Sequence, residues 1–316
     1  MEQTLLLLTA TIFLLTAPPV TLSVEANASV NRDARAMTEK VILPATTDVD
    51  KTQAITIRFR AGVGDKPFNC AETYNGIGTT GSSVKVTDFR FFVTDVRLID
   101  AKGNEFPVSL SNDGKWQNER VALVAFESGE RGCGADQTNM EVKGTAAIGS
   151  YVGLRLSIGV PPQENHVDPA TAPSPLNLTR MFWSWNAGYK FMRLEMNTSG
   201  QPKGYVLHLG STDCRPSVPG DVSTTQCSFE NRPDVYLAQF NPLTDVVQVN
   251  VKALYDGVNV DVNQENTGVG CMSAQRDSDC AGVFKNLGLP FSGARPVAQS
   301  FMRAEKFVKS DVKPSN

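Results

Sequence analysis

YVGLRLSIGV, at residues 151–160, is the stretch that decides the fold class of this chain. Apolar residues occupy every second position, and small or polar residues stand between them. A period of two puts successive side chains on opposite faces of an extended strand, so the pattern predicts a β-strand with one buried face. The side chains expected to point into the core are those of Val152, Leu154, Leu156, Ile158 and Val160.

The same alternation recurs at other places along the chain. TQAITIRFRA at residues 52–61 and VVQVNVKAL at residues 246–254 each predict another strand with one buried face. VKVTDFRFFVTDVRLID at residues 84–100 is also typical of a strand, but its alternation slips near Asp88 or Asp95. Such a slip predicts a β-bulge or a break near one of these two aspartates.

Turn-forming residues separate the predicted strands. GNE at residues 103–105 predicts a turn, and NTSGQPKG at residues 197–204 lies between two alternating runs and predicts a hairpin. The chain has many short strands and no regular alternation of strands with helices. It therefore predicts an all-β fold, a single antiparallel β-sandwich domain with disulfides over residues 51–316.

The N-terminal residues predict export rather than part of the core. LLLLTATIFLLTA at residues 5–17 is an uncharged apolar run, and Ala-Asn-Ala at residues 26–28 fits a cleavage site, so residues 1–28 are predicted to be a signal peptide. An uncleaved membrane anchor is the alternative, but a double proline follows the apolar run, so no stable membrane span is expected. The polar, aperiodic residues 29–50 predict a flexible segment.

Six cysteines agree with an oxidising compartment outside the cytoplasm. The short separations favour two local disulfides, and the remaining two cysteines are then left for each other. The absence of a C-x-x-C pair argues against a zinc site built from cysteine. The predicted pairs are Cys214 with Cys227, Cys271 with Cys280, and Cys70 with Cys133.

Charge and motifs limit the classes of function. A net charge of −3 without a basic stripe argues against a nucleic-acid partner. No G-x-S-x-G nucleophile motif occurs, and only two histidines are present to act as a general base. We therefore expect a protein that is not an enzyme. The alternative is an exported hydrolase that acts on a carbohydrate or an ester, since the many carboxylates would allow a glycosidase pair.

The two histidines are the candidate metal ligands. His166 follows a predicted strand and a Pro-Pro pair, while His208 lies within a predicted strand. Two imidazoles suit copper, whereas a catalytic zinc site made of histidines alone needs a third. Trp183 and Trp185 lie two residues apart, on the same side of a strand, close in sequence to His166. The alternative interpretation of each is structural: a surface histidine, or core aromatics.

Several motifs, in this order, resemble those of one family. They are DFRFFVTDVRLID, WQNERVALVAFE, GVPPQENHVDPATAPSPLN, MFWSWNAGYKFMRLE, LHLGSTDC and CMSAQRDSDC. The chain is similar to the MbnP-like family of bacterial exported copper-binding proteins, a four-cysteine group with a W-x-W motif. The resemblance covers residues 52 to 301.

The resemblance implies a function for these residues. It implies a periplasmic or secreted protein of copper homeostasis with one copper ion held by two histidines, which correspond here to His166 and His208. It also implies a partner, a MauG-like dihaem peroxidase of the MbnH type, that converts a tryptophan to kynurenine. The tryptophans of the W-x-W motif are Trp183 and Trp185 in this chain.

Overall fold

A computed structural model describes residues 51–126, 137–184 and 186–308 of the chain. The fold described below belongs to the unit Thr47–Asn316. The predicted signal peptide and the predicted flexible segment at 29–50 lie outside the described residues. Within those residues, no helix has the length and apolar character needed to cross a membrane.

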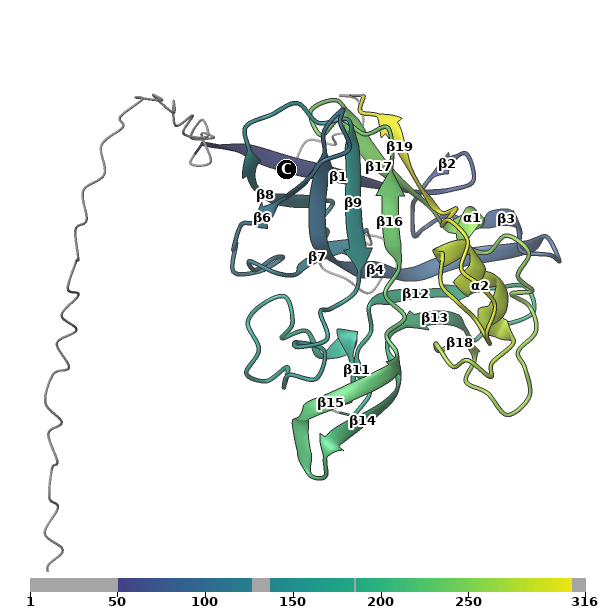
Figure 1. The fold of residues 1–316 in the computed structure, drawn as a ribbon. Helices are drawn as coiled ribbons and strands as arrows, with labels where there is room; N and C mark the ends of the chain where they lie inside the picture. The colour runs from purple at the N-terminus through teal and green to yellow at the C-terminus, as the bar shows by residue number, and fades with distance from the viewer. Residues whose placement is uncertain (1–50, 127–136, 185, 309–316) are drawn as a thin grey trace, which may run out of the picture. The chain divides into compact units, whose positions relative to one another are not determined.

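Two β-sheets make up most of the fold (Figure 1). The first sheet has the strand order β19-β17-β1-β8-β6, and β2 pairs with β1. Its strands are β1 (Thr52–Val63), β2 (Lys66–Pro67), β6 (Ser109–Leu110), β8 (Glu141–Ala147), β17 (Asp245–Asn250) and β19 (Met302–Lys306).

The second sheet has the order β16-β9-β4-β12-β13-β18, and β3, β5 and β7 also pair with β4. Its strands are β3 (Tyr74–Ile77), β4 (Ser82–Ile99), β5 (Glu105–Pro107), β7 (Ala122–Ala125), β9 (Gly153–Ile158), β12 (Met192–Asn197), β13 (Tyr205–Leu209), β16 (Asp234–Leu237) and β18 (Gly270–Cys271).

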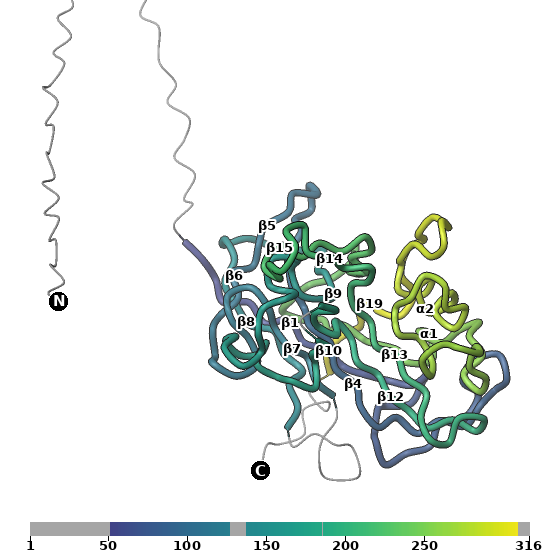
Figure 2. Tube along the Cα trace, turned by 90° about the horizontal axis from the view of Figure 1, so that it is seen from below, coloured from purple at the N-terminus to yellow at the C-terminus, as the bar shows by residue number. Residues whose placement is uncertain are grey.

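Two small hairpins and a few short helices complete the described fold. The hairpins are β10 (Phe182–Ser184) with β11 (Gly188–Tyr189), and β14 (Thr212–Val218) with β15 (Asp221–Phe229). The helices are α1 (Val251–Leu254), α2 (Asp279–Leu287) and a 3-10 turn at Thr179–Met181. Figure 2 views the same elements along a perpendicular direction.

The all-β prediction is confirmed, and most strand pairs are antiparallel. Two pairs are parallel, however: β1 with β17 and β13 with β18. Parallel neighbours cannot be joined by a tight turn, and in both pairs the two strands are far apart in the sequence. The antiparallel β-sandwich is therefore confirmed, with parallel pairing at these two places.

Aromatic side chains join the two sheets. Phe59 of β1 meets Phe91 of β4 edge to face, with ring centroids 5.8 Å apart. Phe89 of β4 packs against Phe126 at 5.0 Å. Burial of each such ring contributes about 1.5–3 kcal/mol, so this cluster is a main source of stability for the packed sheets.

The predicted irregularity of β4 is confirmed, and it occurs near both aspartates. Pairing with β12 shifts register next to Asp88, and pairing with β9 shifts between Thr94 and Arg97. Asp95, inside the second shift, has φ of 52°, a left-handed conformation that Asp tolerates better than most residues. These bulges bend β4, so one long strand pairs with β12 along its first half and with β9 along its second.

Two details of the predicted strands were wrong. Val152 is 44% exposed, because β9 begins only at Gly153, whereas the four later apolar residues of that stretch are buried. The strand predicted over 246–254 ends at Asn250, and helix α1 follows. The Asn250 side chain accepts hydrogen bonds from the backbone N–H groups of Lys252 and Ala253 and so starts the helix.

The local disulfides predicted from sequence separation are confirmed. Cys214 pairs with Cys227 across β14 and β15, and Cys271 of β18 pairs with Cys280 of α2. Cys70 is also disulfide-bonded. Its predicted partner, Cys133, lies outside the described residues.

Candidate metal centre

His208 lies in β13, on the face that also carries charged residues of the neighbouring strand. In the register of β12 and β13, Arg193 is directly opposite His208. The His208 Nε2 atom is 2.7 Å from the Glu195 Oε1 atom. His208 is 9% exposed, so it is a buried imidazole with a fixed carboxylate partner rather than a surface histidine.

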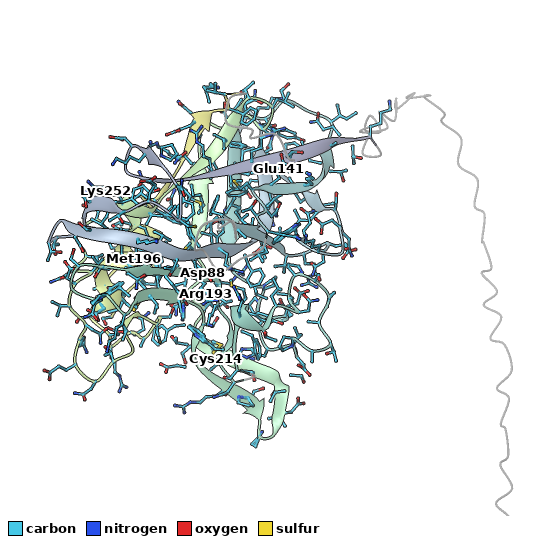
Figure 3. The ribbon with its side chains drawn as sticks, turned by 180° about the vertical axis from the view of Figure 1, so that it is seen from behind. Asp88, Glu141, Arg193, Met196, Cys214 and Lys252 are labelled. Atoms are coloured by element: carbon cyan, nitrogen blue, oxygen red, sulfur yellow. A yellow bond between two sulfur atoms is a disulfide. The ribbon has the colours of Figure 1, made fainter. Side chains whose placement is uncertain are left out.

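Glu195 belongs to a chain of buried and half-buried charges that crosses three strands. Arg193 Nε donates to Glu195 Oε1 at 2.7 Å, and the same guanidinium contacts Asp88 Oδ2 at 3.1 Å. Arg90 Nε donates to Asp88 Oδ1 at 2.8 Å. Figure 3 labels Asp88 and Arg193 on neighbouring strands. Each charge in this chain has an opposite charge beside it, as burial of ions requires.

The charge network changes the acidity of Glu195. Burial alone would raise the pKa of this carboxyl group. Hydrogen bonds from His208 and Arg193, together with the charge of Arg193, outweigh burial and lower the pKa to about 2. Glu195 is therefore ionised at neutral pH and accepts hydrogen bonds from both neighbours.

Trp183 of β10 lies beside His208. The centroids of the two rings are 6.4 Å apart, and their planes are inclined by 58°. The six-membered part of the indole lies over Gly210, where an added Cβ would be only 2.5 Å from Cζ3. Only glycine at position 210 leaves room for the indole in this orientation.

The other residue of the W-x-W motif, Trp185, lies outside the described residues. The methionines near the motif are accounted for by packing. Met181, Met192 and Met196 are buried in the hydrophobic core, where a flexible thioether side chain fills space.

The loop that carries His166 is held through its neighbour Asn165. The Asn165 Oδ1 atom accepts a hydrogen bond from the backbone N–H of Tyr189 at 3.0 Å. The Tyr189 hydroxyl donates to the Leu176 carbonyl at 2.6 Å, farther along the same loop. The Tyr189 ring packs edge to face on Phe92 and Phe182. One buried tyrosine therefore fixes the loop against the β10–β11 hairpin.

His166 itself faces the disulfide of the β14–β15 hairpin. Its Nε2 atom is 3.5 Å from Cys227 Sγ and 3.2 Å from Asn165 Nδ2. Ligand atoms of His166, Cys214 and Cys227 all lie within 4.8 Å of one another. The two sulfurs are bonded to each other, however, and only a thiolate is a strong metal ligand.

The structure places Trp183 beside His208, and His166 against the disulfide hairpin that follows β13. Trp183 contacts His208 directly. β14 belongs to the disulfide hairpin that His166 faces. It begins three residues after the end of β13, the strand that carries His208. Among the described residues, the group of close ligand atoms that includes His166 consists of His166, Cys214 and Cys227. His208 is not part of this group.

Glu195 and Tyr189 were not identified from the sequence as residues of this site. A signal for Glu195 exists, because Arg193 and Glu195 alternate in a strand whose hairpin partner carries His208. Correct hairpin pairing would have predicted these three side chains on one face. Tyr189 gives no comparable signal, since its role depends on a loop that is distant in sequence.

Comparison with known proteins identifies a family. The MbnP family model matches residues 52–273. Among solved structures, MbnP from Methylosinus trichosporium matches with a TM-score of 0.73 and 30% sequence identity, covering 82% of this chain and 100% of that chain. No curated protein sequence matches the chain.

The contact between Trp183 and Gly210 predicts that a methyl group added at position 210 destabilises the fold. In Gly210→Ala the new Cβ would also lie 2.7 Å from the Tyr189 carbonyl oxygen, so the indole must move. We expect a loss of about 1–3 kcal/mol in the free energy of unfolding, measured by chemical denaturation. Gly149→Ala is the control, because its Cβ meets only ordinary contacts at 3.5 Å or more. Equal stabilities of the two variants would contradict this packing.

The lowered pKa of Glu195 predicts a dependence of stability on pH. A carboxyl group whose pKa falls from 4.5 to about 2 on folding stabilises the fold above the higher value. That contribution is lost as the pH drops through this window. The free energy of unfolding, measured by denaturation from pH 5 to pH 2, should therefore decline less for Glu195→Gln than for the parent protein.

Glu230→Gln removes an exposed carboxylate outside the network and serves as the matched control. Its free energy of unfolding should decline as steeply with falling pH as that of the parent protein. If the free energy of unfolding of Glu195→Gln declined as steeply as that of the parent protein and of Glu230→Gln, the network would not hold Glu195 ionised.

Proposed function

This chain belongs to the MbnP family, and we propose on that premise that it is an exported copper-binding protein with one copper site built on His166 and His208. The observation that carries the proposal is the environment of His208. This buried imidazole is held by a carboxylate on one side and lies beside a tryptophan on the other.

The donor set fits copper. Imidazole nitrogen is a good donor to both common oxidation states of this metal. A metal-binding histidine usually directs its second ring nitrogen to a carboxylate, which fixes the ring and raises its basicity. Glu195 occupies that position at Nε2 of His208, which leaves Nδ1 as the nitrogen available to a metal. The disulfide sulfurs and the core methionines add no strong ligand.

Trp183 is the tryptophan whose position suits a role at this site. We propose that a partner, a MauG-like dihaem peroxidase of the MbnH type, converts Trp183 or Trp185 to kynurenine. In this oxidation two hydrogen peroxide molecules are consumed, the C2–C3 bond of the indole breaks, C2 leaves as formate together with one water, and an aromatic amine remains on the side chain. At Trp183 that amine would form next to His208, where it would alter the surroundings of the copper.

The proposed setting is the periplasm or the exterior of the cell. The local disulfides Cys214–Cys227 and Cys271–Cys280 support it, since such bonds persist in oxidising compartments. In this setting the protein binds copper for homeostasis and is not itself an enzyme. Its contribution is to hold the metal and to present the tryptophan to the partner.

The alternative of a hydrolase uses the same histidine. His208 with Glu195 has the arrangement of a general base and the carboxylate that orients it. A catalytic serine would have to form a hydrogen bond with the imidazole of His208, but the side-chain hydrogen bond described for this imidazole goes to Glu195. Among the described residues, no serine is hydrogen-bonded to the His208 imidazole, so copper binding is the better-supported function.

The proposal predicts that both histidines are needed for copper binding. His166→Ala and His208→Ala should each weaken Cu(I) binding by more than about 100-fold, because loss of even an outer partner of a ligand costs 10–100-fold. Competition with a chromophoric Cu(I) chelator measures the affinity, and circular dichroism checks that each variant is folded.

Asn197→Ala is a suitable control, because it changes an exposed turn at the opposite end of β12. It should bind copper as the parent protein does. Unchanged stoichiometry and affinity in either histidine variant would place the copper elsewhere and refute the proposed site.

A further inference from the structure

The β14–β15 hairpin holds two cysteines in register independently of their disulfide. Cys214 and Cys227 are directly opposite in the strand pairing, and Thr212 with Phe229 and Arg215 with Gln226 continue the pairing on either side. The hairpin extends beyond the two main sheets, below β12 and β13 in the view of Figure 1. Because backbone pairing flanks both cysteines, separation of the sulfurs leaves them on facing positions.

His166 approaches this pair from a separate loop. Its Nε2 atom lies 3.5 Å from Cys227 Sγ, and the three ligand atoms lie within 4.8 Å of one another. The hydrogen bond from the Tyr189 backbone to the side chain of Asn165 fixes the loop next to His166. The position of this imidazole therefore does not depend on the disulfide.

The two described disulfides differ in exposure. Cys271 and Cys280 are both fully buried, at 0% exposure each. Cys214 and Cys227 are partly exposed, in a hairpin whose outer residues face solvent. A thiol reductant must reach a sulfur atom to attack it, so the hairpin disulfide is the more accessible of the two.

We propose that reduction of the Cys214–Cys227 disulfide creates a second metal site, in which the two thiolates and His166 bind a soft cation such as Cu(I). A dithiol reductant gives two electrons and two protons to the disulfide. Its own sulfurs become a disulfide, and Cys214 and Cys227 become thiols. Binding of the cation then displaces the two thiol protons to solvent.

The chemistry of the three ligands selects the cation. Thiolate sulfur is a soft ligand that favours Cu(I), and imidazole is compatible with it. This site shares His166 with the proposed copper site but does not use His208. It thus goes beyond the proposed function, and different variants test the two sites. Since one imidazole serves both, the state of the hairpin disulfide would decide which set of ligands holds the metal.

The experiment compares oxidised and reduced protein. The full chain is treated anaerobically with a dithiol, the dithiol is removed by gel filtration, and Cu(I) is added in competition with a chromophoric chelator. X-ray absorption at the copper edge then detects sulfur among the ligands. The parent protein, His208→Ala and the triple variant His208→Ala/Cys214→Ser/Cys227→Ser are each measured in both states.

We expect copper–sulfur scattering in the reduced parent protein and in reduced His208→Ala, and none in their oxidised forms. The reduced triple variant should bind Cu(I) more than about 100-fold more weakly than reduced His208→Ala, since it lacks two direct ligands. Its comparison with His208→Ala also separates any thiols elsewhere in the chain from those of the hairpin.

Absence of copper–sulfur scattering in the reduced parent protein would overturn the proposal, even if the triple variant failed to fold. Equal Cu(I) affinity of reduced His208→Ala and a folded triple variant would overturn it as well. Loss of binding in oxidised His208→Ala tests only the two-histidine site. The failure of one site can therefore be told from the failure of the other.

Discussion

The buried ion pairs across β4, β12 and β13 are the constraint on which the site depends. Asp88, Arg193 and Glu195 are removed from most of the solvent, and a buried charge without a partner is strongly destabilising. The partners can meet only in one register of the three strands. That register places His208 opposite Arg193 and within hydrogen-bonding distance of Glu195. The charges thus fix which way the imidazole points as well as how the strands pair.

A second constraint acts through Tyr189. Its backbone holds Asn165, its hydroxyl holds Leu176, and its carbonyl lies against Gly210. The His166 loop, the hairpin of Trp183 and the end of β13 are therefore brought together around one residue. Segments that are distant in the sequence form the candidate site because each packs on this tyrosine. The disulfide hairpin follows directly from the same end of β13, which explains how His166 comes to face two sulfurs.

The sequence predicted those features that depend on local pattern. A period of two identified β1, β4, β9, β12 and β13, and short separations identified two disulfides. The prediction was wrong where a specific contact overrode the alternating pattern. At Asn250, for example, the side chain caps a helix within the segment predicted to be a strand. The parallel pairing of β1 with β17 and the contact of His166 with Cys227 join distant segments, and no pattern within either segment encodes them. The two histidines of the chain and the family resemblance both indicated His166 and His208, whereas Glu195 emerged only from the strand register.

The central claim is that one copper ion is held between His166 and His208 in the disulfide-bonded protein. Crystals of the copper-loaded oxidised protein, measured on both sides of the copper absorption edge, would locate the metal by its anomalous scattering. We expect one strong anomalous peak bonded to Nδ1 of His208 and to an imidazole nitrogen of His166, beside Trp183. A peak that lacks either imidazole among its ligands, or that lies at a surface carboxylate, would contradict it.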